Sequence, residues 1–150
     1  MKNFCAAICA AVLLMTGCGE DSQATPAAVK EAAQVKNSVT IQINGKNFSA
    51  TLEDNPTAHA FADKLPLEVD MAELNGNEKY FYLDADLPSD SERVGQIHSG
   101  DLMLYGSNCV VIFYKDFATS YSYTRLGKLD KPADLEKILG TGNVRVTFRE

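Results

Sequence analysis

The stretch Val39–Glu53, "VTIQINGKNFSATLE", decides the fold class of this chain. Apolar and polar residues alternate on both sides of Asn44-Gly45, and a period of two is typical of a strand with one buried face. The Asn-Gly pair tolerates the positive φ angles of a two-residue hairpin turn. The sequence therefore predicts a β-hairpin at this point.

The segment after the hairpin predicts a short helix. Asp54–Pro56 supplies capping residue types and a proline suited to the first helical position, and the pattern ends before Pro66. The expected apolar face is formed by Ala58, Phe61, Ala62 and Leu65. His59 falls off this face, and we expect an ordinary surface pair with Asp63, one turn away.

Strands dominate the remainder of the chain. Apolar runs predict them at "LEVDM" (67–71), "KYFYL" (79–83), "DLMLY" (101–105), "CVVIFY" (109–114), "SYSYTRL" (120–126) and "NVRVTF" (143–148). Both faces of "CVVIFY" are apolar, so we expect this strand to be covered on both sides. Residues 132–139 predict a second short helix. About eight strands and two short helices, without βαβ alternation, indicate a mainly β fold: a closed, mostly antiparallel barrel with helices over its openings.

The N-terminal residues have the features of an export signal. Lys2 precedes the apolar run Phe4–Met15, which is shorter than the roughly 20 apolar residues that span a membrane. Thr16–Cys18 resembles the bacterial lipoprotein box, although Met15 stands where leucine is usual. An ordinary secretory signal and an uncleaved anchor are the alternatives.

The lipoprotein resemblance implies a domain organisation. Residues 1–17 would be the signal peptide, Cys18 would be acylated, and residues 18–37 would be a tether too polar to pack a core. Gly19 follows the cysteine, which implies sorting to the outer membrane, with the domain facing the periplasm. Residues 38–150 then form one domain.

Cysteine usage and charge exclude several classes of protein. Cys5 and Cys9 leave with the signal and Cys18 carries lipid, so Cys109 alone remains and no internal disulfide can form. Removal of Lys2 leaves 13 basic and 20 acidic residues, a net charge of −7, with no basic run. This pattern argues against a nucleic-acid partner and against electrostatic binding to anionic lipid.

No cluster of residues in the sequence indicates a metal site, a cofactor site or a catalytic nucleophile. His59 and His98 lie far apart in the sequence, and Cys109 lies in the middle of a predicted strand. There is no Gly-x-Ser-x-Gly elbow and no phosphate-binding glycine loop. We therefore expect neither a metal nor a cofactor.

Four segments together resemble the bacterial cyclophilin-like proteins. They are "SVTIQINGKNFSATLEDNPTAHAFADKLPL" (38–67), "NEKYFYL" (77–83), "GQIHSGDLMLYGSNCVVIFYKDF" (95–117) and "SYSYTRLGKL" (120–129). The resemblance covers Val39–Phe148 and implies an eight-stranded cyclophilin-like barrel with two helices. It brings no established activity with it.

The true cyclophilins are prolyl isomerases, and their signature is largely missing here. It runs Phe-His-Arg, then Phe, then Gln-Gly-Gly-Asp, and only Gly100-Asp101 fits it. His98 stands where the glutamine would be, Arg93 is three residues off register, and the chain has no tryptophan. We therefore expect no isomerase activity above background.

The stretch "SYSYTR" is the candidate binding face. In a strand, Tyr121, Tyr123 and Arg125 share one face. Arg125 is expected to face outward or line the barrel's edge, stacked on Tyr123 or paired with Glu78 or Asp101. One interpretation is a ladder that only stabilises neighbouring strands. The other is a groove that binds a peptide or small ligand, because exposed Tyr and Arg often form binding hot spots.

The groove, if present, should lie beside the loop that carries Gln96, His98 and Asp101. The leading functional expectation is a lipid-anchored, monomeric binding module of the cell envelope, without catalysis, for a peptide, protein or small-molecule ligand. The alternatives are a degenerate prolyl isomerase and an accessory domain to a flavodoxin-like redox partner, since relatives are sometimes joined to such domains.

Overall fold

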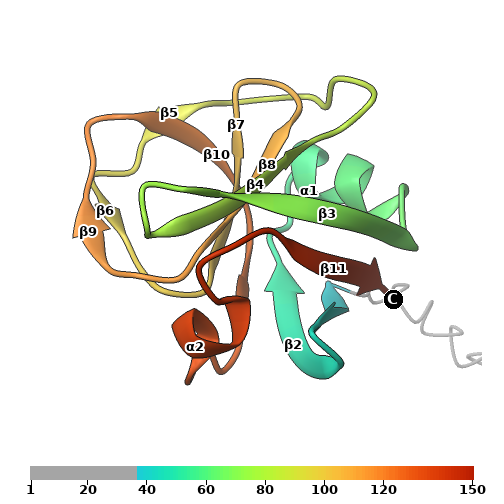
Figure 1. The fold of residues 1–150 in the computed structure, drawn as a ribbon. Helices are drawn as coiled ribbons and strands as arrows, with labels where there is room; N and C mark the ends of the chain where they lie inside the picture. Colours follow the sequence, from blue (N-terminus) through green and yellow to red (C-terminus); the bar gives the residue numbers. More distant parts are fainter. Residues whose placement is uncertain (1–36) are drawn as a thin grey trace, which may run out of the picture. The chain divides into compact units, whose positions relative to one another are not determined.

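The computed structural model describes residues 37–150; the predicted signal, Cys18 and nearly all of the predicted tether lie outside the described residues. Residues 37–150 form eleven strands and two helices (Figure 1). In chain order these are β1 Ser38–Ile43, β2 Lys46–Leu52, α1 Pro56–Ala62, β3 Leu67–Leu74, β4 Glu78–Tyr82, β5 Glu92–Arg93, β6 Gln96–Ile97, β7 Asp101–Tyr105, β8 Cys109–Phe113, β9 Phe117–Ala118, β10 Ser122–Leu129, α2 Leu135–Leu139 and β11 Val144–Arg149.

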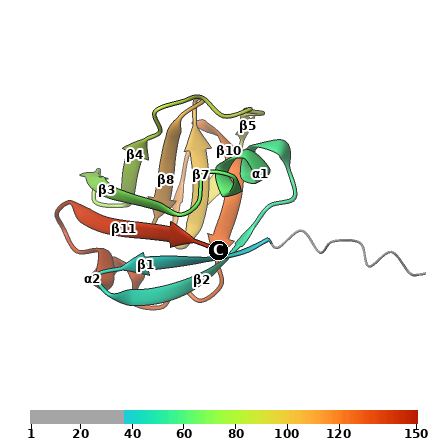
Figure 2. The same cartoon turned by 90° about the vertical axis from the view of Figure 1, so that its right-hand side faces the viewer.

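Eight of these strands close into an antiparallel barrel. Their order is β2-β1-β11-β3-β4-β8-β7-β10, and β10 pairs back onto β2 to complete the circle (Figure 2). The closing pair sets Gly127 opposite Leu52, where a Cβ on residue 127 would collide with the carbonyl oxygen of Thr51. Only glycine permits this approach of two backbones. The predicted fold class, a closed eight-stranded barrel with two short helices, is confirmed.

The hairpin and the first helix form as their sequences predict. Asn44 and Gly45 adopt φ angles of 48° and 77° between β1 and β2. The Asn55 side chain caps α1 by accepting a hydrogen bond from the backbone N–H of Ala58 at 2.8 Å. The expected His59–Asp63 pair is wrong, because the His59 ring instead lies 2.9 Å from Asp54, before the helix.

Both helices contribute side chains to the barrel core. Phe61 of α1 packs edge-on against Phe148 of β11, with ring centroids 5.5 Å apart, and both rings are fully buried. Leu135 and Leu139 of α2 are buried in the same core cluster. The two helices lie far apart in both views (Figures 1 and 2), at different ends of the barrel.

A second, smaller apolar cluster lies outside the barrel wall. It joins outward side chains of β7, β8 and β10, among them Met103, Phe113 and Tyr123, to Ile97 of β6 and Phe117 of β9. All five residues of β8 are therefore buried, as its two apolar faces predict. The two-residue strands β5, β6 and β9 were not expected from the sequence, because two residues are too few to show a period.

Candidate functional site

The structure brings three of the predicted site residues to one hollow and leaves the other four elsewhere. Tyr121, Tyr123 and Glu78 line a hollow of about 260 Å³ on the outside of the barrel. Its remaining lining residues are Leu74, Asn75, Tyr80, Tyr82, Tyr105, Cys109 and Val111. Five of the chain's six tyrosines therefore meet here, and we call these ten residues the tyrosine hollow.

Strand alternation explains why these side chains gather. In β4, Tyr80 and Tyr82 alternate with Phe81, which belongs to the barrel core, so the tyrosines point outward. The register of the sheet places Cys109 of β8 opposite both Tyr82 of β4 and Tyr105 of β7. Three adjacent strands thus present one outward row of side chains, and Tyr121 and Tyr123 extend it from the neighbouring β10 segment.

The rings of the tyrosine hollow stand at steep angles to one another. Tyr80 and Tyr82 make an edge-to-face pair at 5.8 Å and 79°, and Tyr105 and Tyr121 make one at 6.2 Å and 90°. Tyr105 also lies 5.6 Å from Tyr123 at 54°. Because the rings do not stack in parallel, they form walls around a space.

Exposure separates the floor of the hollow from its rim. Tyr123 is only 6% exposed and Cys109 5%, whereas Tyr82 is 65%, Tyr121 62% and Tyr105 47% exposed. A binding face formed by the whole of "SYSYTR" would require Tyr123 to be surface-accessible, and it is not, because it packs edge-on against Phe113 at 5.5 Å in the second, smaller apolar cluster. Burial raises the pKa of Tyr123 to about 12 and also raises the pKa of the Cys109 thiol, so both groups are neutral near pH 7.

Four large apolar or aromatic side chains stay exposed in residues 37–150, and all of them line this hollow. They are Leu74, Tyr82, Tyr105 and Tyr121. Scattered exposed hydrophobic residues are ordinary, but a contiguous patch is typical of a binding surface. Their convergence distinguishes this face from the rest of the described domain.

Glu78 is the one charged side chain in the lining of the hollow. Its exposed fraction is 9%, and no hydrogen bond or ion pair within residues 37–150 engages its carboxyl group. Burial, and then the negative charge of Glu73, raise the pKa of Glu78 above its ordinary value. The carboxyl oxygens of Glu78 therefore open into the hollow without a protein partner, and partial burial makes the charged form less favourable than in water. A carboxyl group with a perturbed pKa in a hollow is a candidate for ligand contact.

Arg125 lies apart from the tyrosines. Its guanidinium Nε is 3.3 Å from Glu92 of β5, and it lines a different hollow together with Asn55 and Thr124. The expected partners Glu78 and Asp101 are therefore wrong. Tyr123 of β10 pairs with Glu92 of β5, a two-residue strand that the sequence did not predict. This pairing brings the Glu92 carboxylate close to Arg125.

The loop of Gln96, His98 and Asp101 does not line the tyrosine hollow either. The buried Asp101 carboxylate accepts a hydrogen bond from the backbone N–H of His98 at 2.8 Å, and its oxygens lie 3.8 Å from the His98 ring and 3.9 Å from Lys128. The Gln96 amide bonds to the adjacent Ile97 carbonyl. These contacts hold the turn before β7, so a structural role accounts for them.

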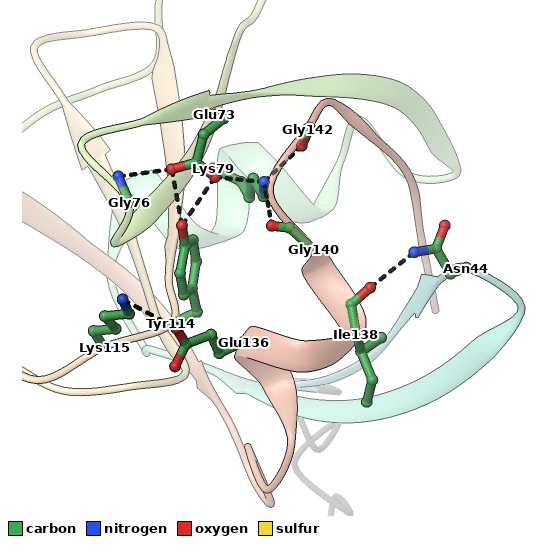
Figure 3. A network of polar contacts seen from close by, with 10 residues as sticks. All are labelled: Asn44, Glu73, Gly76, Lys79, Tyr114, Lys115, Glu136, Ile138, Gly140 and Gly142. Atoms are coloured by element: carbon green, nitrogen blue, oxygen red, sulfur yellow. Dashed lines mark hydrogen bonds and ion pairs between the residues drawn. The ribbon is translucent and has the colours of Figure 1, made fainter.

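A second polar cluster at the end of the barrel is fully satisfied (Figure 3). Lys79 of β4 is completely buried, and its ammonium group donates to the Glu73 carboxylate and to the carbonyl oxygens of Gly140 and Gly142, at 2.9 and 2.6 Å. The Tyr114 hydroxyl donates to the same carboxylate, 2.8 and 2.9 Å from its two oxygens. We call Glu73, Lys79, Tyr114 and the two glycine carbonyls the lysine network.

The lysine network is a structural clamp. It ties β3, β4 and the end of β8 to the loop between α2 and β11. Burial of Glu73 opposes ionisation, but the hydrogen bonds from Lys79 and Tyr114 outweigh it and lower the pKa of Glu73. All three ammonium protons of Lys79 have partners, so no donor remains for a ligand.

Sequence reasoning missed Tyr80, Tyr82, Tyr105 and Leu74. The signal was present, because Tyr80 and Tyr82 in "KYFY" repeat the two-residue spacing of Tyr121 and Tyr123 in "SYSY". What the sequence did not contain is the strand order that sets β4, β8, β7 and β10 side by side. Within residues 37–150, no group of three or more His, Cys, Asp or Glu side chains is placed to hold a metal ion, and no helix has the length and apolarity to cross a membrane.

Comparisons with known proteins agree with this fold. No curated protein matches the chain at a significant level. Among solved structures, the solution structure of the hypothetical protein AF2241 from Archaeoglobus fulgidus is similar, with a TM-score of 0.50 and 16% sequence identity, over 75% of this chain and 92% of that one. At that identity the likeness concerns the fold alone. The family model described as the Cyclophilin-like family matches residues 41–149, and with that match over most of its length the chain belongs to the Cyclophilin-like family.

Proposed function

We propose that this protein is a binding module of the cell envelope, anchored by lipid at Cys18, whose ligand occupies the tyrosine hollow. The observation that carries the binding role is the convergence of exposed side chains: every large apolar or aromatic side chain exposed in residues 37–150 lines this one hollow. Tyrosine supplies a large contact area with few rotatable bonds, so ordering it on binding is inexpensive in entropy.

The size of the hollow limits what it holds. About 260 Å³ lies just below the range of roughly 300 to 1,000 Å³ that is usual for small-molecule sites. A small molecule, or one side chain of a peptide, fits such a volume better than a large cofactor. The lipid anchor rests on the sequence of residues 1–18, and the acidic net charge of the chain supplies no electrostatic attraction to anionic lipid.

Prolyl isomerisation receives no support from the site. The cyclophilin mechanism needs a guanidinium group beside the proline, and neither Arg93 nor Arg125 lines the tyrosine hollow. We therefore propose binding without catalysis, and a protease-coupled assay with an Ala-Pro peptide should show no acceleration by the full chain.

Intrinsic fluorescence offers a direct test of binding. The chain has no tryptophan, and five of its six tyrosines line the hollow, so tyrosine emission reports occupancy. We expect members of a panel of small cationic, anionic and neutral molecules and short peptides to change the emission of the full chain. The double variant Tyr82→Ser, Tyr121→Ser, altered only at the exposed rim, should lose the response, whereas Lys137→Ser, away from the hollow, should keep it. A panel with no binder, or a binder equally tight on the rim variant, would contradict the proposal.

The anchor is tested separately. Replacing Cys18 with Ala should move the protein from the membrane fraction to the soluble fraction of the producing cell, because the acylation site is lost. Unchanged partitioning of the Cys18→Ala variant would remove the anchor from the proposal and leave the binding site untouched.

A further inference from the structure

We propose that the tyrosine hollow is an ammonium site, which takes the positively charged, methylated ammonium head group of a small molecule. This inference rests on the proposed binding role and adds the chemical class of the ligand. Its basis is a set of contacts at one place: aromatic walls, a single buried carboxyl group, and no basic side chain in the lining.

The walls have the geometry that favours a cation. An aromatic ring presents a negative face, and a cation within about 6 Å of the ring centre is attracted to it. The pairs Tyr80–Tyr82 and Tyr105–Tyr121 meet at 79° and 90°, so neighbouring rings turn faces and edges to a shared space. A tetrahedral ammonium group placed among these rings can contact several of them at once.

The carboxyl group of Glu78 decides the sign of the ligand charge. Glu78 is nine-tenths buried, lines the hollow, and has no protein partner within residues 37–150. Tyr123 and Cys109, which share the lining, are neutral near pH 7. The Glu78 carboxylate is therefore the formal charge that a ligand meets, and it attracts a cation and repels an anion.

The contrast with Glu73, which is partly exposed, and with the buried Asp101 supports this interpretation. Glu73 receives Lys79 and Tyr114, and Asp101 receives the His98 backbone N–H and lies near Lys128. Glu78 is the buried acid whose counter-charge the described chain does not supply. A bound ammonium group would supply it and would lower the energy of an otherwise unpaired charge.

A methylated ammonium fits better than a primary one. The lining offers aromatic faces, Leu74 and Val111; its one charged acceptor is Glu78, beside the neutral oxygens of Asn75 and the tyrosine hydroxyl groups. A primary ammonium carries three donors that must each find an acceptor on leaving water, whereas a trimethylammonium group has no donor to satisfy and is attracted by the aromatic faces.

The test compares molecules of the same shape and different charge. Choline, its neutral isostere 3,3-dimethylbutan-1-ol and the anion 3,3-dimethylbutanoate are titrated into the full chain in a non-ionic detergent without a choline head group, and tyrosine emission is followed. We expect choline to bind at least about tenfold more tightly than the neutral isostere, and the anion to bind least. Ethanolamine, the primary ammonium, should bind more weakly than choline.

Variants assign the selectivity to Glu78. Glu78→Gln keeps the shape of the side chain and should markedly reduce the preference for choline over the neutral isostere, leaving the part that the aromatic rings supply, while the isostere affinity stays the same. Glu92→Gln, an acid at the neighbouring hollow, is the matched control and should keep full selectivity. Melting curves establish that both variants are folded.

The outcomes separate this inference from the binding role on which it rests. Equal binding of choline and the neutral isostere would overturn the ammonium site and leave the tyrosine hollow a binding site. Choline selectivity that is undiminished in Glu78→Gln would also overturn the assignment. No response to any of the four probes would overturn the ammonium site, and the wider panel then decides whether the hollow binds anything.

Discussion

Glu78 and Lys79 are adjacent charged residues in β4, but their side chains lie on opposite faces of the strand and in different environments. Lys79 points into the end of the barrel, where it is completely buried and donates to three oxygen acceptors. Glu78 points outward into the tyrosine hollow, where it is nearly as buried and has no partner within the described chain. A charge paired within the protein stabilises the fold, whereas a partly buried carboxyl group that opens into a hollow without a protein partner is a candidate for ligand contact.

The largest effect should come from breaking the lysine network at its centre. Lys79→Met keeps the length of the side chain but leaves the Glu73 carboxylate and the carbonyls of Gly140 and Gly142 without their donor. We expect a loss of about 3 to 5 kcal/mol in the free energy of unfolding. Urea denaturation followed by circular dichroism measures it.

The matched control for Lys79→Met is Lys115→Met. Lys115 pairs with Glu136 at 3.0 Å, but both side chains are largely exposed. Exposed pairs contribute about 0 to 1 kcal/mol, so this variant should be close to wild type. Equal losses in the free energy of unfolding of the two variants would show that burial does not determine how much the Lys79 contacts stabilise the fold.

A smaller loss is expected from Tyr114→Phe. This change removes only the hydroxyl that donates to the Glu73 carboxylate, and leaves the Lys79 contacts in place. A hydrogen bond to a charged group contributes about 1.5 to 3 kcal/mol. The same denaturation experiment should place this variant between wild type and Lys79→Met, and a loss as large as that of Lys79→Met would contradict the assignment of Lys79 as the centre.

Glu78→Gln should change stability in the opposite direction. Burial raises the pKa of Glu78 in the folded protein above its ordinary value of 4.5, so the folded state is favoured when this group is protonated. Its contribution is fully present below 4.5 and is lost as the pH rises through the raised pKa. Removing the charge should therefore stabilise the domain at pH 7.

The pH profile distinguishes this effect from simple repacking. The increase in the free energy of unfolding caused by Glu78→Gln should be present at pH 7. It should vanish near pH 3.5, where the wild-type Glu78 side chain is also neutral. Glu73 has the reverse behaviour, since its lowered pKa gives stability that is present above 4.5 and lost on acidification. A gain from Glu78→Gln that is the same at both pH values would mean that the charge is not its cause.

The sequence predicted the barrel and only part of the site, for physical reasons that differ between the two. The hairpin at Asn44-Gly45 and the helix capped by Asn55 are local, so neighbouring residues specify them. The tyrosine hollow depends on which strands pair, and residues as distant as Leu74 and Tyr121 meet only because β4, β8, β7 and β10 are adjacent. Period-two alternation predicts which side chains of a strand share a face, but it does not predict which strands lie beside that strand.

The same limit explains the misplaced arginine. Strand alternation grouped Arg125 with Tyr121 and Tyr123, and the two tyrosines do meet in the hollow. The register of β10 shifts between Arg125 and Gly127, and β5 pairs beside it, so Arg125 meets Glu92 instead. Bulges and two-residue strands are set by tertiary packing, which a single sequence does not display.

A small effect on stability should come from Tyr121→Ala, at the rim of the hollow. Tyr121 is 62% exposed and its one aromatic neighbour is Tyr105, an edge-to-face contact at 6.2 Å. Such pairs contribute about 0.5 to 1.5 kcal/mol, and exposure favours the lower end, so the expected loss is about 0.5 kcal/mol.

Tyr123→Ala is the matched comparison within the same hollow, because Tyr123 is buried and packs on both Tyr105 and Phe113. Truncating a buried aromatic side chain costs about 3 to 5 kcal/mol. If the rim exists for binding, Tyr121→Ala should weaken ligand binding about tenfold or more while the melting temperature of the variant stays near that of wild type. If Tyr121→Ala instead loses several kcal/mol in the free energy of unfolding, the exposed tyrosines are part of the structural scaffold. The contrast between the lysine network, which stabilises the fold, and the tyrosine hollow, which binds a ligand, would then be wrong.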